Sequence, residues 1–275
     1  MSYTADVRLP DTAQIKAFQQ RILRFYRVHG RDLPWRKSTD PYAITVSEIM
    51  LQQTQVERVI DKYEAWLKRW PTWHSLAKAT DRELLAAWSG LGYNRRALNL
   101  GKLAREVIAR FDSELPGAPE QLLSLPGIGP YTAHAILVFA FNQPLVTIDT
   151  NIRKVLLHEF GYPASISKEN LQALALAVLP RRKSRDWHNG LMDYSRLVLP
   201  KQIKGLPPIS KQSRFQGSLR QIRGEIVRQL VTRSRVTVGT IARALDRSEV
   251  DVIKAAEGLQ KDGMVRFAGK TIALR

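Results

Sequence analysis

Two acidic residues in apolar surroundings are the first candidates for chemistry in this chain. Glu48 lies among aliphatic side chains in AITVSEIMLQQTQV, and Asp149 follows an apolar run in VTIDTNIRKVL. A carboxyl in apolar surroundings has a raised pKa and can act as a general acid near neutral pH. The local patterns also fit plainer roles, because Glu48 suits an exposed helix position and Asp149 suits the N-cap of the next helix. Their assignment therefore depends on the motifs around them.

A glycine-containing turn lies between the two carboxylates. In LPGIGPYTAHAI, residues 125–136, Gly127 and Gly129 precede a helix that Pro130 opens. Glycines let backbone N–H groups approach an anion closely, and a helix start adds partial positive charge. Such a turn can hold a DNA phosphate without reading sequence, although many helix hairpins contain a Gly-x-Gly turn.

The elements that must position these residues are short amphipathic helices separated by proline and glycine, and we expect an all-α class. Thr54 and Glu57 have the spacing of a capping box, which predicts a helix–helix junction at Gln52 and Gln53. Besides the helix that follows this junction and ends near Trp70, helices are predicted over about 11–29, 43–51, 81–89, 94–111, 118–123, 130–141, 150–160, 168–179 and 186–198.

The last quarter of the chain follows a different pattern. Residues 201–217 are basic, contain proline and glycine, and predict a linker between a domain at 1–200 and one at 218–275. Helices near 218–232, near 239–245 and from Ser248 to Gly263, followed by strands at 264–267 and 271–274, predict a winged helix-turn-helix. Residues 201–275 contain 16 Lys and Arg against 6 Asp and Glu. DNA contact is the favoured interpretation of this charge, and a dimerisation or packing module is the alternative.

The composition of the whole chain indicates a nucleic-acid partner. The 275 residues include 43 Lys and Arg against 25 Asp and Glu, a net charge of +18, which suits a polyanion; a ribosome-associated factor is the alternative. There is no cysteine, so disulfides, iron–sulfur clusters and a cysteine nucleophile are excluded. Without a signal-like start or a long apolar run, we expect a soluble cytoplasmic, nucleoid-associated protein.

Four motifs in order resemble the MutY adenine glycosylases of the helix-hairpin-helix (HhH-GPD) superfamily. They are LPWRKSTDPYAITVSEIMLQQTQVERVI, LAAWSGLGYNRRALNL, LPGIGPYTAHAI and IDTNIRKVL, and the similarity covers about residues 14–195. The resemblance implies a fold of two helical lobes, with the N-terminal helix packed on the lobe of residues 140–200. It implies that Glu48 protonates the flipped adenine at N7 and later handles the water. Asp149 is then expected to stabilise the oxocarbenium-like sugar.

The resemblance also assigns supporting residues. Tyr131 and Asn151 match the tyrosine and asparagine that accompany the carboxylates, and Arg36, with Trp35 beside it, is expected at the base pocket. The family inserts a glutamine and a tyrosine into the duplex at the opposing base, and we call these the wedge residues. They match Gln53, which follows Gln52, and Tyr93. The turn with Gly127 and Gly129 is expected to bind DNA, together with a monovalent cation at 125–130. The implied partner is double-stranded DNA with a mispaired or damaged base, bound by a monomer.

Departures from the family limit what the resemblance implies. Tyr131 stands where strand-cutting relatives carry a lysine, so no Schiff base is expected and the enzyme should be monofunctional. The four cysteines of the usual [4Fe–4S] cluster are absent, so we expect a colourless protein in which Leu191, Met192, Tyr194, Leu197 and Val198 pack instead. The Nudix-like domain that senses 8-oxoguanine is expected to be absent.

The sequence therefore leaves three hypotheses for the function. The favoured one is excision of adenine opposite 8-oxoguanine or guanine, without strong lyase activity. A uracil, thymine or hypoxanthine mismatch glycosylase is the nearest alternative. The third is a non-catalytic winged-helix DNA-binding protein on a glycosylase scaffold, against which the intact Glu48 and Asp149 argue.

Overall fold

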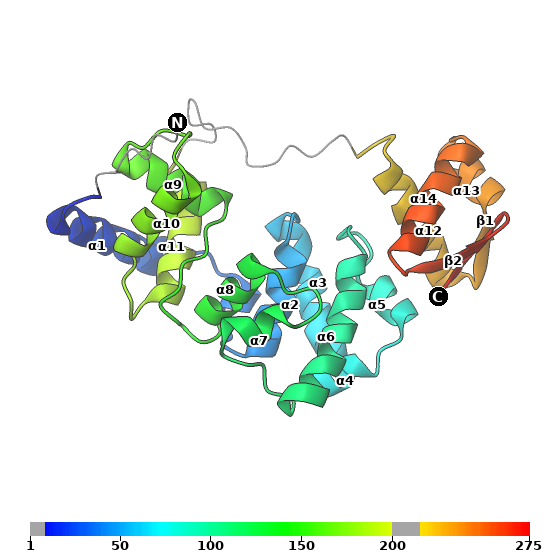
Figure 1. The fold of residues 1–275 in the computed structure, drawn as a ribbon, viewed down its shortest axis with the longest axis horizontal. Helices are drawn as coiled ribbons and strands as arrows, with labels where there is room; N and C mark the ends of the chain where they lie inside the picture. The colour runs from blue at the N-terminus through cyan, green and yellow to red at the C-terminus, as the bar shows by residue number, and fades with distance from the viewer. Residues whose placement is uncertain (1–8, 200–214) are drawn as a thin grey trace. The chain divides into compact units, whose positions relative to one another are not determined.

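The computed structural model describes residues 9–199 and 215–275, and most of them are helical (Figure 1). The predicted all-α class is confirmed, with three short strands near the C-terminus as the only sheet in the described residues. Up to residue 199 the elements are α1 Thr12–His29, the 3-10 turn η1 Pro34–Arg36, α2 Pro41–Leu51, α3 Val56–Arg69, α4 Trp73–Ala77, α5 Asp81–Ala87, α6 Arg95–Phe111, α7 Pro119–Leu123, α8 Pro130–Phe139, α9 Thr150–Phe160, α10 Lys168–Ala177 and α11 Ser184–Leu197.

Side-chain caps explain where five of these helices begin, α1, α4, α5, α9 and α10. Asp11 and Gln14 cap α1 reciprocally, as do Thr80 and Glu83 at α5, so backbone donors that a helix start leaves open are satisfied. The predicted capping box of Thr54 and Glu57 is wrong. The N-cap of α3 is Gln55, without a side-chain cap bond, and Thr54 Oγ1 instead donates to the carbonyl of Gln52 at 3.1 Å. The junction between α2 and α3 nevertheless lies at residues 52–55, so the helix break was predicted and its cause was not.

The described residues form two compact units. The first comprises residues 9–48, 116–124 and 128–199, and the second comprises 49–115, 125–127 and 215–275. In the first unit Phe18 and Ile22 of α1 are buried in one core with residues of α9, α10 and α11. The ring of Phe18 meets those of Phe160 and Trp187 edge-on, at centroid distances of 5.0 and 5.2 Å. The N-terminal helix is thus fixed to the segment that carries Asp149.

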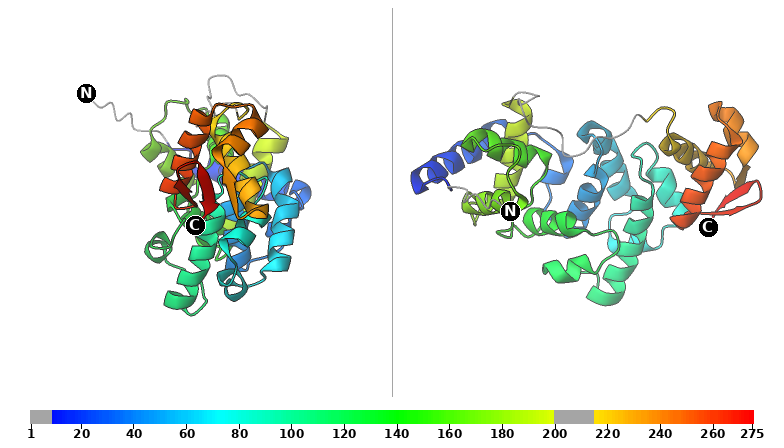
Figure 2. Two further views of the ribbon diagram at one scale, coloured as in Figure 1. Left: turned by 90° about the vertical axis from the view of Figure 1, so that its right-hand side faces the viewer. Right: turned by 45° about the horizontal axis from the view of Figure 1, so that its top comes forward.

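The C-terminal module, residues 219–274, consists of three helices and an antiparallel sheet (Figure 2). Its strand order is β1-β3-β2, so the last strand is the central one, and Ile272 pairs with Val236 on one side and Phe267 on the other. The sequence prediction found two of the three strands and missed β1. The elements are α12 Leu219–Thr232, β1 Arg235–Thr237, α13 Val238–Leu245, α14 Glu249–Lys261, β2 Val265–Ala268 and β3 Thr271–Leu274.

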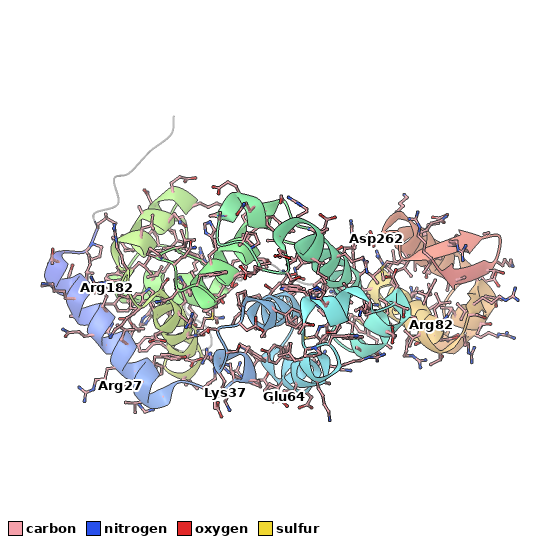
Figure 3. All side chains as sticks on the ribbon, turned by 90° about the horizontal axis from the view of Figure 1, so that it is seen from below. Arg27, Lys37, Glu64, Arg82, Arg182 and Asp262 are labelled. Carbon is pink, nitrogen blue, oxygen red and sulfur yellow. The ribbon has the colours of Figure 1, made fainter. Side chains whose placement is uncertain are left out.

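This module belongs to the second unit and packs on α5 and α6. Leu85 and Leu98 are buried in the same apolar cluster as Ile222 and Ile226 of α12. Arg82 Nη1 donates to the carbonyl of Val231 of α12 at 2.9 Å. Figure 3 labels Arg82, together with Asp262 of the module. A shared core with polar contacts at its edge therefore joins the module to these two helices.

Five residues of α11 and its end were expected to pack in place of an iron–sulfur cluster, and this expectation is only partly right. Leu191 is buried, and Met192 and Tyr194 pack against the core of the first unit. Leu197 and Val198 instead expose 53% and 48% of their surface, so the expectation is wrong for these two residues. Residues 201–214 of the predicted linker lie outside the described part of the chain. None of the described helices combines the length and the apolar character needed to cross a membrane.

Candidate active site

Glu48 lies near the C-terminal end of α2, a helix whose other side chains are mostly buried. Ile44, Val46 and Ile49 are each at most 4% exposed, because α2 is apolar on nearly every face. Glu48 itself is half-buried, and the loss of water around its carboxyl, followed by the charge of Asp149, raises its pKa to about 8. Glu48 is consequently a carboxylic acid rather than a carboxylate at neutral pH.

Asp149 is both the N-cap of α9 and the partner of Glu48. Its Oδ1 accepts the backbone N–H of Ile152 at 2.7 Å, and its Oδ2 accepts the side-chain amide of Asn151 at 2.9 Å. Burial raises the pKa of Asp149 while these hydrogen bonds lower it, and the net direction is upward. The helix cap and the candidate catalytic group are therefore one residue, and capping fixes its orientation.

The two carboxyls differ in what surrounds their charged forms. N–H donors and the partial positive charge at the start of α9 favour the ionised form of Asp149. At Glu48 both causes of the shift, burial and the charge of Asp149, oppose ionisation. When the pair holds one proton, that proton belongs on Glu48, which leaves Asp149 as the carboxylate.

Tyr131, in the first turn of α8, completes this group. Tyr131 exposes 40% of its surface, but the protein atoms around its phenol, then the charges of Glu48 and of Asp149, raise the pKa of that phenol. The phenol is thus neutral at any physiological pH and can donate a hydrogen bond, but it offers no amine to attack a sugar carbon. All three side chains influence one another electrostatically, so the structure brings together Glu48, Tyr131, Asp149 and, through its amide, Asn151.

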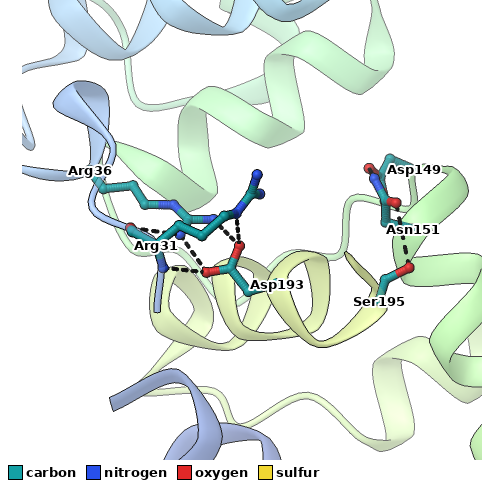
Figure 4. Close-up of polar contacts among 6 residues, drawn as sticks. All are labelled: Arg31, Arg36, Asp149, Asn151, Asp193 and Ser195. Atoms are coloured by element: carbon teal, nitrogen blue, oxygen red, sulfur yellow. Dashed lines mark hydrogen bonds and ion pairs between the residues drawn. The ribbon is translucent and has the colours of Figure 1, made fainter. Parts of the chain in front are cut away.

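Arg36 is held in a separate ion-pair network. Its Nη1 and Nη2 donate to the two carboxylate oxygens of Asp193 at 2.6 and 3.0 Å, and Arg31 Nε donates to the same carboxylate at 2.6 Å. Asp193 is fully buried and the Arg36 side chain is 8% exposed. Figure 4 shows this group apart from Asp149 and Asn151, although Asp193 and Ser195 lie on the same helix. The structure thus gives Arg36 a role in fixing η1 to α11, and Trp35 is buried beside it.

Two residues near the site carried no recognised sequence signal. Ser195 Oγ donates to the side-chain oxygen of Asn151 at 3.4 Å, which orients the amide that holds Asp149. His188 is buried and its pKa is lowered to about 4 by burial. Its Nδ1 contacts the carbonyl of Ser184 at 2.7 Å, and its Nε2 accepts the N–H of Thr147 at 3.3 Å. The neutral imidazole of His188 therefore fixes the segment that leads into Asp149. In the sequence, the only signal for this role is that His188 lies on the buried face of α11.

The turn before α8 needs only one of its two glycines for its conformation. Gly127 has a φ of +82°, and a Cβ there would lie 2.9 Å from Cβ of Asn99, whereas Gly129 has an ordinary backbone with open space beside it. Gly129 is the N-cap of α8 and, as a glycine, provides no side-chain cap for that helix. That absence suits close approach by an anion.

The predicted wedge residues lie in the second unit, on two loops held by one arginine. Gln53 and Tyr93 both have positive φ, 53° and 47°, and both are exposed. Arg96 of α6 donates to backbone carbonyls on both sides, which ties the loop after α2 to the loop before α6. The acceptors are the carbonyls of Ile49 at 2.7 Å, Met50 at 3.2 Å, Gln52 at 2.8 Å, Leu91 at 3.1 Å and Gly92 at 3.0 Å.

Comparison with known proteins agrees with this geometry. The family described as HhH-GPD superfamily base excision DNA repair protein matches residues 46–181. The adenine DNA glycosylase of Mycolicibacterium smegmatis is 33% identical over 262 residues, which cover 88% of this chain and 87% of that protein. The chain belongs to the HhH-GPD superfamily of base excision DNA repair proteins. Because that match covers 88% of 275 residues, it extends beyond residue 214 into the C-terminal module.

A relative named for thymine and uracil is similar over a smaller share of the chain. The thymine/uracil-DNA glycosylase of Pyrobaculum aerophilum is 33% identical over 198 residues, 69% of this chain and 86% of that protein. The solved structure of a thermostable thymine-DNA glycosylase matches with a TM-score of 0.64 at 31% identity, covering 70% of this chain and 91% of that one. The chain is a base-excision DNA glycosylase that binds DNA.

Proposed function

We propose that this glycosylase removes adenine mispaired in duplex DNA, opposite 8-oxoguanine or guanine, with Glu48 as general acid and Asp149 as the stabiliser of the sugar cation. The observation that carries the proposal is that Glu48 and Asp149 lie together but favour different protonation states. Glu48 has a pKa of about 8 beside a carboxyl that is oriented by N–H donors. A protonated acid next to a fixed carboxylate is the division of labour that glycoside cleavage needs.

The chemistry follows from these protonation states. When the bond between C1′ and N9 breaks, both electrons go to the base, and a proton moved from Glu48 to N7 neutralises the leaving adenine. The sugar develops positive charge, which the carboxylate of Asp149 offsets. Water then attacks C1′, and its surplus proton returns to Glu48. Because the target atom is inaccessible inside a duplex, the nucleotide must leave the stack first.

A protonated Glu48 favours a purine over a pyrimidine. Uracil and thymine can leave as delocalised anions that hydrogen bonds stabilise, whereas adenine needs a proton to become a good leaving group. Hypoxanthine shares N7 and is the second candidate. A pyrimidine mismatch remains the alternative because a relative of equal identity is named for thymine and uracil. Tyr131 supports hydrolysis without strand cleavage.

A panel of duplexes tests the substrate. Adenine, hypoxanthine, uracil and thymine are each placed opposite guanine and 8-oxoguanine, and single-turnover excision is measured with wild type, Glu48→Gln and Asp149→Asn. We expect excision of adenine that both variants lose while still binding the duplex. Excision confined to uracil or thymine would overturn the adenine assignment. If wild type excised no base from any duplex, the non-catalytic DNA-binding reading would replace it.

A further inference from the structure

The loop that carries the predicted wedge Tyr93 has a strained backbone. This wedge loop, residues 90–94, contains Gly90 at φ +93°, Gly92 at φ +72° and Tyr93 at φ +47°. The glycines adopt such angles without penalty, but a tyrosine in the left-handed region does so only where surrounding contacts hold it. The position of the Tyr93 ring is therefore set by groups outside the loop.

One side of the loop is held from within α6. Arg96 Nη2 donates to the carbonyls of Leu91 and Gly92, and its guanidinium carbon lies 5.7 Å from the centroid of the Tyr93 ring. These contacts fix the base of the loop and one face of the ring. They do not reach the phenolic oxygen at the far end of Tyr93, a residue that is 46% exposed.

The phenolic end is reached from the C-terminal module. Arg220 Nη1, in the first turn of α12, donates to Tyr93 Oη at 3.3 Å. On its own this contact is one exposed hydrogen bond. Its weight comes from the docking of α12, which places the start of the helix beside the loop.

That docking rests on several independent contacts. Leu85 and Leu98 share the buried cluster of the module. Arg82 Nη1 donates to the carbonyls of Val231 and Arg233 at 2.9 and 3.3 Å, and Arg95 pairs with Asp262 at 3.6 Å. The module is thus anchored to both helices that flank the wedge loop, α5 before it and α6 after it.

The exposed charges of α14 fit this role better than they fit insertion into a DNA groove. In a helix-turn-helix the second helix of the pair enters the major groove, and α14 has that place in the sequence. Its exposed charges are balanced, with Glu249 and Glu257 against Lys254 and Lys261. A helix with no net positive face gains little from meeting phosphates.

We propose that the C-terminal module supports the wedge loop, and that Arg220 is a positioning residue that holds Tyr93 for insertion into the duplex. The inference rests on the proposed function, because a wedge matters only to an enzyme that flips a base. It assigns the module an intramolecular task and makes α12, rather than α14, the helix nearest the DNA.

A double-mutant cycle on the full chain tests the coupling. Arg220→Ala and Tyr93→Phe each remove one partner of the hydrogen bond, and we expect each to lower the single-turnover excision rate by about fivefold, the value of one hydrogen bond of ~1 kcal/mol. The double variant should be no slower than either single one. Arg220→Lys, which keeps a donor, should recover part of the loss.

Arg228→Ala is the matched control, because it removes the same charge from the same helix at a residue paired with Glu225 within α12. It should leave excision unchanged. Multiplying effects in the double variant, or an equal loss with Arg228→Ala, would overturn the inference and leave only a general charge effect. A thermal melt of each variant excludes misfolding.

A second measurement separates this inference from the proposed function. If wild type excises no base from the panel, the proposed function fails. The same cycle is then measured as affinity for a duplex with a tetrahydrofuran abasic site. There too, non-additive losses at Arg220 and Tyr93 support the coupling, and additive losses refute it.

Discussion

Burial and then the charge of Asp149 raise the pKa of Glu48, while donors at the start of α9 and on Asn151 support the charge of Asp149 itself. When the two carboxyls share one proton, it therefore lies on Glu48 and leaves Asp149 ionised. An N-cap is ordinarily a stabilising device, but here the same bonds orient a carboxylate toward an acid. Glu48 and Asp149 come from two separate sequence motifs. The apolar packing of α2 removes water from the carboxyl of Glu48, which makes its pKa higher than that of Asp149.

Excision should slow at alkaline pH as Glu48 loses its proton. The pKa of Glu48 is raised from 4.5 to about 8, so the acid form is dominant below about pH 8 and falls tenfold per pH unit above it. We expect the single-turnover rate to follow that fall. Glu48→Gln should be slower by about 10²- to 10⁴-fold, with no corresponding limb. A wild-type rate that stays constant up to pH 9.5 would contradict Glu48 as the proton donor.

The same shift predicts an effect on stability. An unfolded Glu48 ionises near 4.5, and the folded one near 8, so between these values the folded state binds the extra proton and stability falls as the pH rises. Glu48→Gln removes this cost and should stabilise the protein progressively from pH 5 to pH 8, by on the order of 4 kcal/mol at the plateau. Denaturant unfolding at pH 5, 6.5 and 8 measures it. The control is Glu64→Gln, an exposed residue of α3, for which no trend with pH is expected.

Tyr131 is predicted to decide the fate of the strand after excision. Its phenol cannot form a Schiff base with the sugar, so borohydride should trap no protein–DNA adduct with wild type. Tyr131→Lys introduces an amine beside Glu48 and Asp149, and we expect it to give a trapped adduct. Tyr131→Phe serves as the control without an amine. Trapping by wild type in high yield would assign the attacking amine to another residue.

Much of the fold and of the site follows from local signals in the sequence. Helix periods and Pro/Gly breaks predicted most helices before residue 200 to within a few residues, because each amphipathic face must be buried within its own unit. Glu48 and Asp149 were singled out by an acid in an apolar run and by an N-cap pattern. Their electrostatic interaction could not be predicted from these signals, since it joins residues about one hundred positions apart.

The errors have physical causes. The capping box of Thr54 and Glu57 failed because Thr54 bonds back to Gln52 instead, a competition between local partners that spacing does not resolve. The strand β1 has three residues, too few for an alternating pattern, and exists only because β3 pairs with it. The ion pair of Arg36 with Asp193 of α11 was not predicted either, while a place for Arg36 at a base pocket stays a prediction. No sequence pattern near either residue indicates that pair.

Asp193→Asn should act on stability first. Asp193 accepts from both Arg31 and Arg36 while fully buried, and these bonds outweigh burial and lower its pKa. Asparagine keeps one acceptor oxygen, but it carries no charge and turns an NH2 donor toward the two guanidinium groups, which costs about 3–5 kcal/mol. We expect a fall in Tm of roughly 10 °C. The neighbouring exposed pair provides the control, because Asp32→Asn breaks only a surface bridge to Lys37 and should cost less than about 1 kcal/mol. An unchanged Tm in Asp193→Asn would show that the network does not hold η1 to α11.

Arg96 is predicted to affect both wedge residues at once. Its guanidinium binds carbonyls of the loop that carries Gln53 and of the loop that carries Tyr93. Arg96→Met keeps the aliphatic stem but leaves these carbonyls without their charged donor, at about 1–3 kcal/mol for charged hydrogen bonds. We expect weaker binding to an abasic duplex and slower excision, with both loops more accessible to hydrogen exchange. Arg105 lies on the same helix and donates to the carbonyl of Ala77 at 3.3 Å, outside both loops, so Arg105→Ala should change none of these. Increased exchange in only one of the two loops would show that they are held independently.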